Sequence, residues 1–399
     1  MSSGTNTKKE SKSSLIAVFD IGSASIGGIL FKKRKNFAPE IIASIRKSVH
    51  FSKKKKFSEM WHSTHNAFVE VSKYLQKNSK ESPEQALCVF SSPWYTAQTK
   101  ITKVVRDENF KVDEDLVKEI IQDNVEEFKR EWGAKKHDKE EANVSLESAY
   151  TKALLNGYEV RDFFGKSAHN LELYTYLSLS MGFLKEKVQK EILGYIHSDK
   201  IYLHSFPFVL FNVLKNTIDT KEGALFIDIS GEITDVLLIR NNIIEEVNSI
   251  PKGENFFIRR FASAFNIEPE DARARLQQYQ RGELAKPYVQ KAQIVIETAA
   301  DEWGKHLVGL FGDISKDKFL PQNLYFSGPA MMVGLKEIKK QVSENDFAKF
   351  TIFNKPFNIR YLLPDSLKHH FDFKKGFSDN KDIFLLISVL FANNFLKNK

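Results

Sequence analysis

Two acidic residues, each at the end of an apolar run and each followed by a small polar turn, are the candidates for chemistry in this sequence. The clearer one is Asp228, which ends the apolar run 225–227. The turn Ser230-Gly231-Glu232 follows, and a second apolar run begins at Ile233, so the pattern predicts a buried β-hairpin. Gly231 can bring backbone N–H groups close to a ligand, and Asp228 is placed to hold a hydrated divalent cation. The combination predicts a phosphate-binding turn.

The same arrangement occurs near the N-terminus. The apolar run 17–19 ends at Asp20, Gly22-Ser23-Ala24-Ser25 forms the turn, and the next apolar run begins at Ile26. A D-x-x-G turn between two strands is common, so a single copy is weak evidence for a ligand site. Two matching hairpins about 200 residues apart predict two related half-domains that face one phosphate tail.

The motifs D-I-G-S-A-S at 20–25 and D-I-S-G-E-I-T-D at 228–235 resemble the two phosphate loops of the actin/Hsp70/sugar-kinase ATPase superfamily. The resemblance implies an α/β fold of two related lobes that hold ATP and Mg²⁺ between them. It places Mg²⁺ near Asp20 and Asp228, held through water. The nucleotide contacts that it implies in these loops are Asp20, Gly22, Ser23, Ala24, Ser25, Asp228, Ser230, Gly231, Glu232 and Thr234.

Two later segments extend the resemblance. Ile250-Pro251-Lys252-Gly253 is similar to the I-P-x-G-G turn of the family, which implies that Gly253 lies near the nucleotide. The segment 323–335 resembles the adenosine loop, in which a strand feeds a tight turn against the purine. The contacts implied there are Gly328, Pro329, Ala330 and Met331. Pro329 stands where the family has a second Gly, and because proline lacks an N–H, we expect a backbone hydrogen bond to be lost.

The stretch 94–190 narrows the resemblance to one branch. Strand-like segments at 96–105, 148–155 and 171–180, with a helix capped by Asp113, predict a small α+β insert. Its place between the two hairpins, with N-G-Y at 156–158, resembles the 1C (SHS2) insert of the FtsA/PilM branch. The resemblance is nearest to PilM-like type IV pilus assembly proteins, and it implies an actin-like (RNase H-like duplicated) two-lobed ATPase fold with a 1C-type subdomain.

The expected division of the chain follows from this resemblance. Residues 1–13 are rich in serine and lysine and predict a disordered tail without a signal peptide. The expected boundaries are 14–93 with 191–222 for the first lobe, 94–190 for the insert, 223–255 with 320–399 for the second lobe, and 256–319 for a helical 2B-like subdomain. The apolar helix predicted within 383–396 is too short to span a bilayer and reads as a buried closing helix of the second lobe.

Three positions depart from relatives that hydrolyse ATP. Phe206 stands where such relatives place a Glu or Gln that orients the attacking water, and a phenyl ring cannot accept a proton. The segment 272–276, ending in Leu276, lacks the Glu and Lys that FtsA-like proteins offer to the nucleotide. Pro329 is the third departure. We therefore expect no catalytic residue, and hydrolysis that is weak or absent.

Composition limits the function classes. The chain has 399 residues, 42% hydrophobic and 28% charged, which suffices for two or more cored domains. The single cysteine, Cys88, cannot form an internal disulfide and indicates a reducing compartment. The formal charge is +8, but the lysine block 53–56 has no aromatic platform, so no nucleic-acid partner is expected. His62 and His65 share a helical face without a third ligand and predict no metal site.

These features predict a cytoplasmic nucleotide-binding scaffold that acts at the inner face of the cytoplasmic membrane through its partners. The resemblance implies that it docks the cytoplasmic tail of an inner-membrane protein (PilN-like), and that nucleotide sets the angle between the lobes. An FtsA-like division protein that self-associates and binds a tubulin-like partner stays open. So does a pseudo-ATPase docking frame, which the three departures favour. A small-molecule kinase is less favoured, because no motif supplies a catalytic carboxylate.

Overall fold

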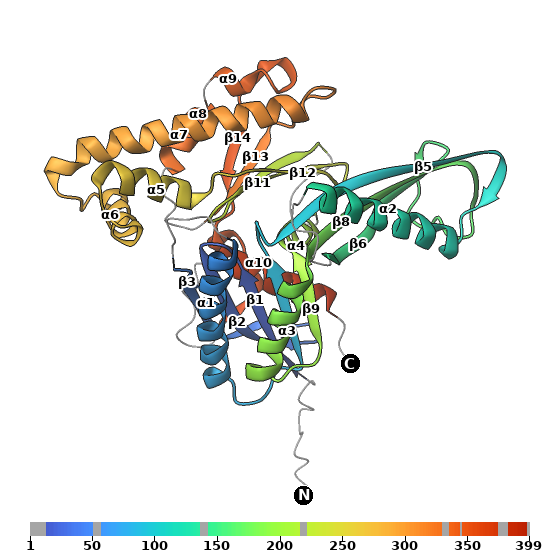
Figure 1. Cartoon of the computed structure of the whole chain (residues 1–399). Helices are drawn as coiled ribbons and strands as arrows, with labels where there is room; N and C mark the ends of the chain where they lie inside the picture. The colour runs from blue at the N-terminus through green and yellow to red at the C-terminus, as the bar shows by residue number, and fades with distance from the viewer. Residues whose placement is uncertain are drawn as a thin grey trace, which may run out of the picture.

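The computed structural model describes residues 13–50, 57–135, 143–215, 222–328, 335–343, 345–373 and 382–396. The lysine block 53–56 and nearly all of the expected N-terminal tail lie outside these ranges. Within them, the strands form three sheets that correspond to the two predicted half-domains and the insert (Figure 1).

The first sheet has the order β15-β3-β2-β1-β4-β9. Its strands are β1 (Ser13–Ile21), β2 (Ser25–Arg34), β3 (Glu40–Ser48), β4 (Gln85–Phe90), β9 (Ile201–Ser205) and β15 (Asp372–Phe373). Because side chains alternate along β1, Ala17 and Phe19 pack against α1 (Phe57–Asn78) and α3 (Gly182–Tyr195), whereas Ile16 and Val18 face α4 (Phe206–Leu214) and α10 (Ile383–Phe395). The first sheet is therefore covered on both faces.

The second sheet has the order β12-β11-β10-β13-β14. Its strands are β10 (Ala224–Ile229), β11 (Thr234–Arg240), β12 (Ile243–Ile250), β13 (Asn323–Ser327) and β14 (Asn358–Tyr361). One face packs against the helical region, which holds α5 (Glu254–Phe265), α6 (Pro269–Arg281), α7 (Lys286–Ile314), α8 (Leu335–Ser343) and α9 (Asn345–Ala348). The other face shares a core with α4 and α10, so these two helices form the layer between the sheets.

The insert is a third sheet with the order β5-β8-β6-β7. Its strands are β5 (Tyr95–Lys111), β6 (Asn143–Leu155), β7 (Tyr158–Glu159) and β8 (Ser167–Met181), and α2 (Glu114–Lys135) covers one face. The predicted cap is confirmed, because the Leu116 N–H donates to Asp113 Oδ1 over 2.8 Å. In Figure 1 the insert extends to one side of the two lobes, opposite α6.

The C-terminal segment differs from the expected boundary, which assigned 320–399 to the second lobe. β15 pairs with β3 of the first sheet, and α10 packs on the first sheet as well as on the second. Short 3₁₀ turns η1 (Ile352–Asn354), η2 (Pro364–Ser366) and η3 (Lys368–His370) lead up to this crossing. A mostly apolar helix is expected to be buried, but its sequence does not indicate which sheet it covers.

None of the helices in the described ranges combines the length and the apolarity needed to cross a bilayer.

Candidate functional site

The two predicted turns lie against each other at the centre of the molecule. Each joins an antiparallel hairpin, β1–β2 for the first turn and β10–β11 for the second. Ser23 Oγ in the first turn accepts a hydrogen bond from the Glu232 N–H in the second over 3.0 Å. Gly231 has no space for a side chain, since a Cβ there would lie 2.6 Å from the Ala24 nitrogen. The fold thus brings both turns to one place.

Several backbone donors in these turns have no hydrogen-bond partner in the part of the chain that the structure describes. The N–H groups of Ser23, Ala24 and Gly231 make no hydrogen bond to any residue in the described ranges. A buried N–H normally finds a partner, and successive free N–H groups in a turn form an anion-binding concavity. The arrangement therefore offers donors to a phosphate group.

Asp228 provides an unsatisfied carboxylate oxygen beside these donors. The residue is 1% exposed, and its Oδ1 accepts a hydrogen bond from Ser327 Oγ over 2.9 Å. Its Oδ2 is buried without a hydrogen-bond partner among the described residues. Burial raises the pKa of Asp228 well above its ordinary value, and the neighbouring Asp235 and Asp20 raise it further. A water-held cation would supply the missing positive charge.

Asp20 has a different environment. Arg46, from β3, donates from Nη2 to Asp20 Oδ2 over 2.7 Å, and Ser91 Oγ lies 3.3 Å from Oδ1. Burial raises the pKa of Asp20, the Arg46 guanidinium opposes this rise, and Asp382 adds to it. Arg46 also donates to Ser25 Oγ over 2.9 Å. The first turn thus holds a positive charge supplied by the protein.

Arg46 was not predicted as a site residue. The β2–β3 register places it opposite Gly27, two residues after the first turn. In the sequence it is one basic residue among 59, and only the strand pairing brings it to the turn. The sequence does contain one indication of this contact. A third strand that pairs antiparallel with β2 ends beside the turn that precedes β2, so a charged residue near the end of that strand is a candidate partner for Asp20.

The remaining predicted residues of the second turn build its frame. Thr234 Oγ1 donates to the Lys252 carbonyl over 2.7 Å and accepts from Trp303 Nε1 over 3.2 Å. Glu232 accepts hydrogen bonds from Arg259 Nη1 at 3.0 Å and Asn255 Nδ2 at 2.9 Å. Their polar groups are engaged within the protein, so they position the turn.

Three further glycines and a serine belong to the expected set. Gly253 packs its backbone against the second turn, since a Cβ there would lie 2.3 Å from the Ser230 carbonyl oxygen. Ser230 Oγ donates to the Ile233 carbonyl over 3.1 Å. Gly328 follows the last residue of β13, and Gly22 donates its N–H to the Ser25 carbonyl over 3.2 Å. Pro329, Ala330 and Met331 lie outside the described residues, so their predicted contact with the adenosine remains an expectation.

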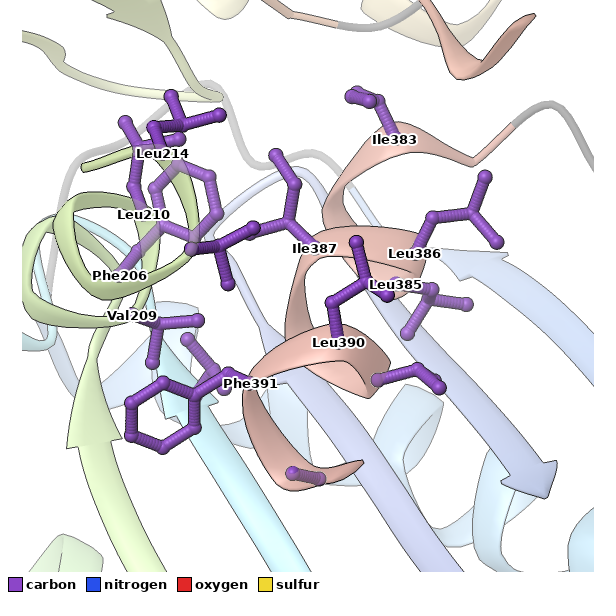
Figure 2. Close-up of a cluster of buried hydrophobic side chains, with 14 of the residues drawn as sticks. Phe206, Val209, Leu210, Leu214, Ile383, Leu385, Leu386, Ile387, Leu390 and Phe391 are labelled. Atoms are coloured by element: carbon purple, nitrogen blue, oxygen red, sulfur yellow. The ribbon is translucent and has the colours of Figure 1, made fainter. Parts of the chain in front are cut away.

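Phe206 and Leu276 lie in apolar packing. Phe206 is 1% exposed at the start of α4, and its ring centroid is 5.1 Å from that of Phe384 in α10. Figure 2 shows its ring among aliphatic side chains that α4 and α10 direct toward each other. Leu276 is buried in the core of the helical region. Neither side chain can orient water.

The donors present fit a phosphate group with a hydrated cation. The free N–H groups and Arg46 suit phosphate oxygens, and Asp228 Oδ2 suits a metal-bound water. No cluster of three or more His, Cys, Asp or Glu side chains in the described ranges is arranged to hold a metal directly.

Comparison with known proteins shows the fold. No protein-family model matches the sequence, and no curated protein matches it. PilM in the PilM-PilN type IV pilus biogenesis complex is similar in structure, with a TM-score of 0.62 at 12% identity over 94% of this chain and 98% of that one. The ethanolamine utilization protein EutJ from Carboxydothermus hydrogenoformans has a TM-score of 0.44 at 10% identity over 88% of this chain and 85% of that one. The chain in the MamK double helical filament has a TM-score of 0.41 at 10% identity, over 87% and 93%.

The likeness to PilM spans both lobes and the insert. It confirms the predicted actin-like ATPase fold with a PilM-like arrangement.

Proposed function

We propose that this chain is a nucleotide-binding scaffold that docks the cytoplasmic tail of a membrane protein, as PilM does for PilN. The observation that carries the nucleotide half is the pair of apposed turns with free N–H groups, beside the unsatisfied Asp228 Oδ2. The docking half is supported by the likeness to a PilM-PilN complex over 94% of the chain. The assignment to the cytoplasm rests on the same likeness and on the single buried cysteine, Cys88.

The site residues have distinct tasks in this proposal. The N–H groups of Ser23, Ala24 and Gly231 bind phosphate oxygens, and Arg46 pairs with phosphate charge. Asp228, assisted by Asp20, holds Mg²⁺ through water, and the bound Mg²⁺ neutralises part of the phosphate charge. Because Phe206 cannot orient an attacking water, bound ATP is hydrolysed slowly or not at all.

A cleft beside the insert suits the docked tail. It has a volume of about 350 Å³ and lies between residues 96–99 of β5 and 245–248 of β12, with Glu131 and Trp132 of α2 at its side. β5 and β12 are edge strands of their sheets, and an extended peptide can pair with such an edge. Glu245 and Glu246 both pair with Lys318, so they share one cation between two carboxylates. Together with Glu131 they favour a basic segment, and cytoplasmic tails of membrane proteins are rich in Lys and Arg.

The position of this cleft would couple docking to nucleotide. One wall belongs to the insert and the other to the second lobe, so a change in the angle between lobes changes the width of the cleft. A tail that binds more tightly to one width of the cleft shifts the equilibrium between closed and open lobes. Nucleotide bound at the two turns shifts the same equilibrium.

The nucleotide half is tested by binding of a fluorescent ATP analogue, with and without Mg²⁺, alongside phosphate release. We expect Mg²⁺-dependent binding by the wild type, loss of that dependence in Asp228→Ala, and negligible release. Asp115→Ala is the matched control, because the Asp115 side chain is 96% exposed on α2. No binding by the folded wild type would leave the pseudo-ATPase docking frame as the function.

The docking half is tested with a labelled peptide of a PilN-like cytoplasmic tail. We expect Glu131→Lys to weaken binding about tenfold, because it reverses a charge at the cleft. Glu119→Lys makes the same change on an exposed face of α2 that does not line the cleft, and should bind as the wild type does. Equal affinities for both variants would exclude this cleft as the docking site.

A further inference from the structure

One guanidinium joins the first phosphate turn to the layer between the lobes. Arg46 donates from Nη2 to Asp20, from Nη1 to Ser25 Oγ, and from Nε to Asp382 Oδ2 over 2.6 Å. Nη2 also lies 3.0 Å from Asp382 Oδ1, so the contact with Asp382 is bidentate. The Arg46 side chain is 29% exposed, and those of Asp20 and Asp382 are 4% and 13% exposed. Three acceptors therefore share one cation.

Asp382 is the N-cap of α10. Its Oδ1 accepts the Leu385 N–H over 3.2 Å, so the carboxylate that pairs with Arg46 also begins the helix. At the other end of α10, Lys33 Nζ donates to the Leu396 carbonyl over 2.5 Å. α10 packs against both sheets, and Figure 2 shows its Ile387 and Phe391 side chains directed toward α4. Any change at Asp382 therefore acts on the helix that both lobes share.

The approach of Arg46 to the turn depends on Gly27. A Cβ at Gly27 would lie 2.6 Å from Arg46 Nη2 and 3.1 Å from Leu385 Cδ2. The missing side chain leaves room for the guanidinium between the turn and α10. Arg46 thus contacts the first turn, through Ser25, and the helix cap, through Asp382, at once.

We propose that Arg46 transmits the state of the phosphate site to α10 by changing partners. Phosphate oxygens bound at the first turn compete with Asp382 for the Arg46 N–H groups. When they take these donors, the Arg46–Asp382 ion pair weakens and the first turn of α10 loosens. This inference rests on the proposed nucleotide site and assigns to it the residue that links it to the interlobe layer.

If phosphate and Asp382 compete for Arg46, each weakens the binding of the other. Removing Arg46 and removing the charge of Asp382 should therefore change the affinity for nucleotide in opposite directions. Arg46→Met removes the cation and should weaken binding of a fluorescent, slowly hydrolysed ATP analogue by about tenfold or more. Asp382→Asn keeps a good N-cap but removes the competing charge, so it should tighten binding several-fold. Lys47→Met is the control, since Lys47 is the next residue on β3 and pairs with Glu70.

The second readout is hydrogen exchange of the α10 amides with and without the analogue. In the wild type, saturating analogue should speed exchange in the first turn of α10 several-fold. In Arg46→Met, at saturation, the analogue should leave that exchange unchanged. Should Arg46→Met fail to fold, Gly27→Ala displaces the guanidinium without changing any charge and should also lose the response.

The outcomes separate this inference from the function on which it rests. Absence of nucleotide binding by the wild type would overturn both. Wild-type binding without a change in α10 exchange would overturn only the role of Arg46. The same conclusion would follow if Asp382→Asn and Arg46→Met shifted the affinity in the same direction, because a purely structural ion pair has no competition to release.

Discussion

The two apposed turns, at 22–25 and 230–232, share a backbone pattern but differ in electrostatics. Both follow an apolar strand that ends in a buried aspartate, and the two hairpins pair in the same antiparallel way. Asp20 meets the Arg46 guanidinium at 2.7 Å. Among the described residues, Asp228 accepts a hydrogen bond from the Ser327 hydroxyl on one carboxylate oxygen and none on the other. A repeated hairpin can therefore serve two tasks. The first turn supplies a cation, and the second leaves a carboxylate oxygen for one.

The supports of the two turns differ as well. The first turn is held by the Arg46 side chain, which contacts Ser25, and by the Val49 N–H, which donates to the Ala24 carbonyl over 2.8 Å. The second is held by backbone, since the N–H groups of Glu254 and Asn255 at the start of α5 donate to the carbonyls of Ser230 and Gly231 over 2.9 and 2.8 Å. The Arg259 side chain adds to this support by donating to Glu232. Each turn thus combines backbone and side-chain support, and only the side-chain contacts can exchange partners.

The largest effect should come from breaking the backbone support. Gly253→Ala places a Cβ 2.3 Å from the Ser230 carbonyl and 2.5 Å from the Gly231 carbonyl. We expect a loss of about 3 kcal/mol in the free energy of unfolding, because backbone must move to admit the methyl group. Chemical denaturation measures it. Gly309→Ala, at a site in α7 with no atom within 4 Å, should instead stabilise by about 0.5–1 kcal/mol. Equal stability of both variants would mean that the second turn adjusts freely.

The support of the first turn should cost less to remove. Arg46→Met leaves two acidic partners, and we expect a loss of about 2 kcal/mol, discounted because the arginine is partly exposed. The double variant Arg46→Met/Asp20→Asn should recover part of that loss, since it also removes one buried charge. Urea unfolding of the single and double variants measures the coupling. Strict additivity would argue against an energetically significant ion pair.

Neutralisation of Asp228 should change stability more than neutralisation of Asp20. Asp228→Asn removes an ill-solvated charge and should stabilise the protein by about 1 kcal/mol at pH 7. Asp20→Asn also removes a buried charge, but it removes a partner of Arg46 as well, so it should stabilise the protein less. Folding raises the pKa of Asp228. Its contribution is therefore fully favourable below its ordinary pKa and is lost as pH rises through the higher folded value.

The pH dependence of this difference is the measurement. Unfolding midpoints of the wild type and Asp228→Asn should converge on acidification and separate toward neutral pH, with the variant above. A separation that grows toward acid instead would contradict a raised pKa at Asp228.

The smallest effect should come from the link between the turns. Ser23→Ala removes the acceptor of the Glu232 N–H and the donor of a longer hydrogen bond, 3.3 Å, to the Ser92 carbonyl. It should cost about 1 kcal/mol, because the longer bond contributes little. Thermal unfolding measures it, with Ser148→Ala on an exposed position of β6 as the control. If the two variants have the same midpoint, the turns are held together by the sheets alone.

Much of the fold could be predicted from local patterns. Apolar runs interrupted by D-x-x-G turns specify the hairpins, because alternation and turn chemistry are properties of neighbouring residues. The Asp113 cap and the strands of the insert follow for the same reason. Resemblance of short motifs then supplied the two-lobed arrangement. The sheet against which α10 packs could not be predicted, because a helix with buried residues on every side has no single apolar face that would indicate its packing partner.

By itself, the sequence determined that two acid-ended hairpins form and that Phe206 stands where a water-orienting residue is expected. Only the tertiary structure decided which charges meet at them. Arg46 reaches Asp20 through the β2–β3 register, and Asp382 reaches Arg46 from 336 residues away. Hairpins depend on contacts between neighbours in the chain, whereas the partner of a buried charge depends on packing between distant segments, which no local pattern records.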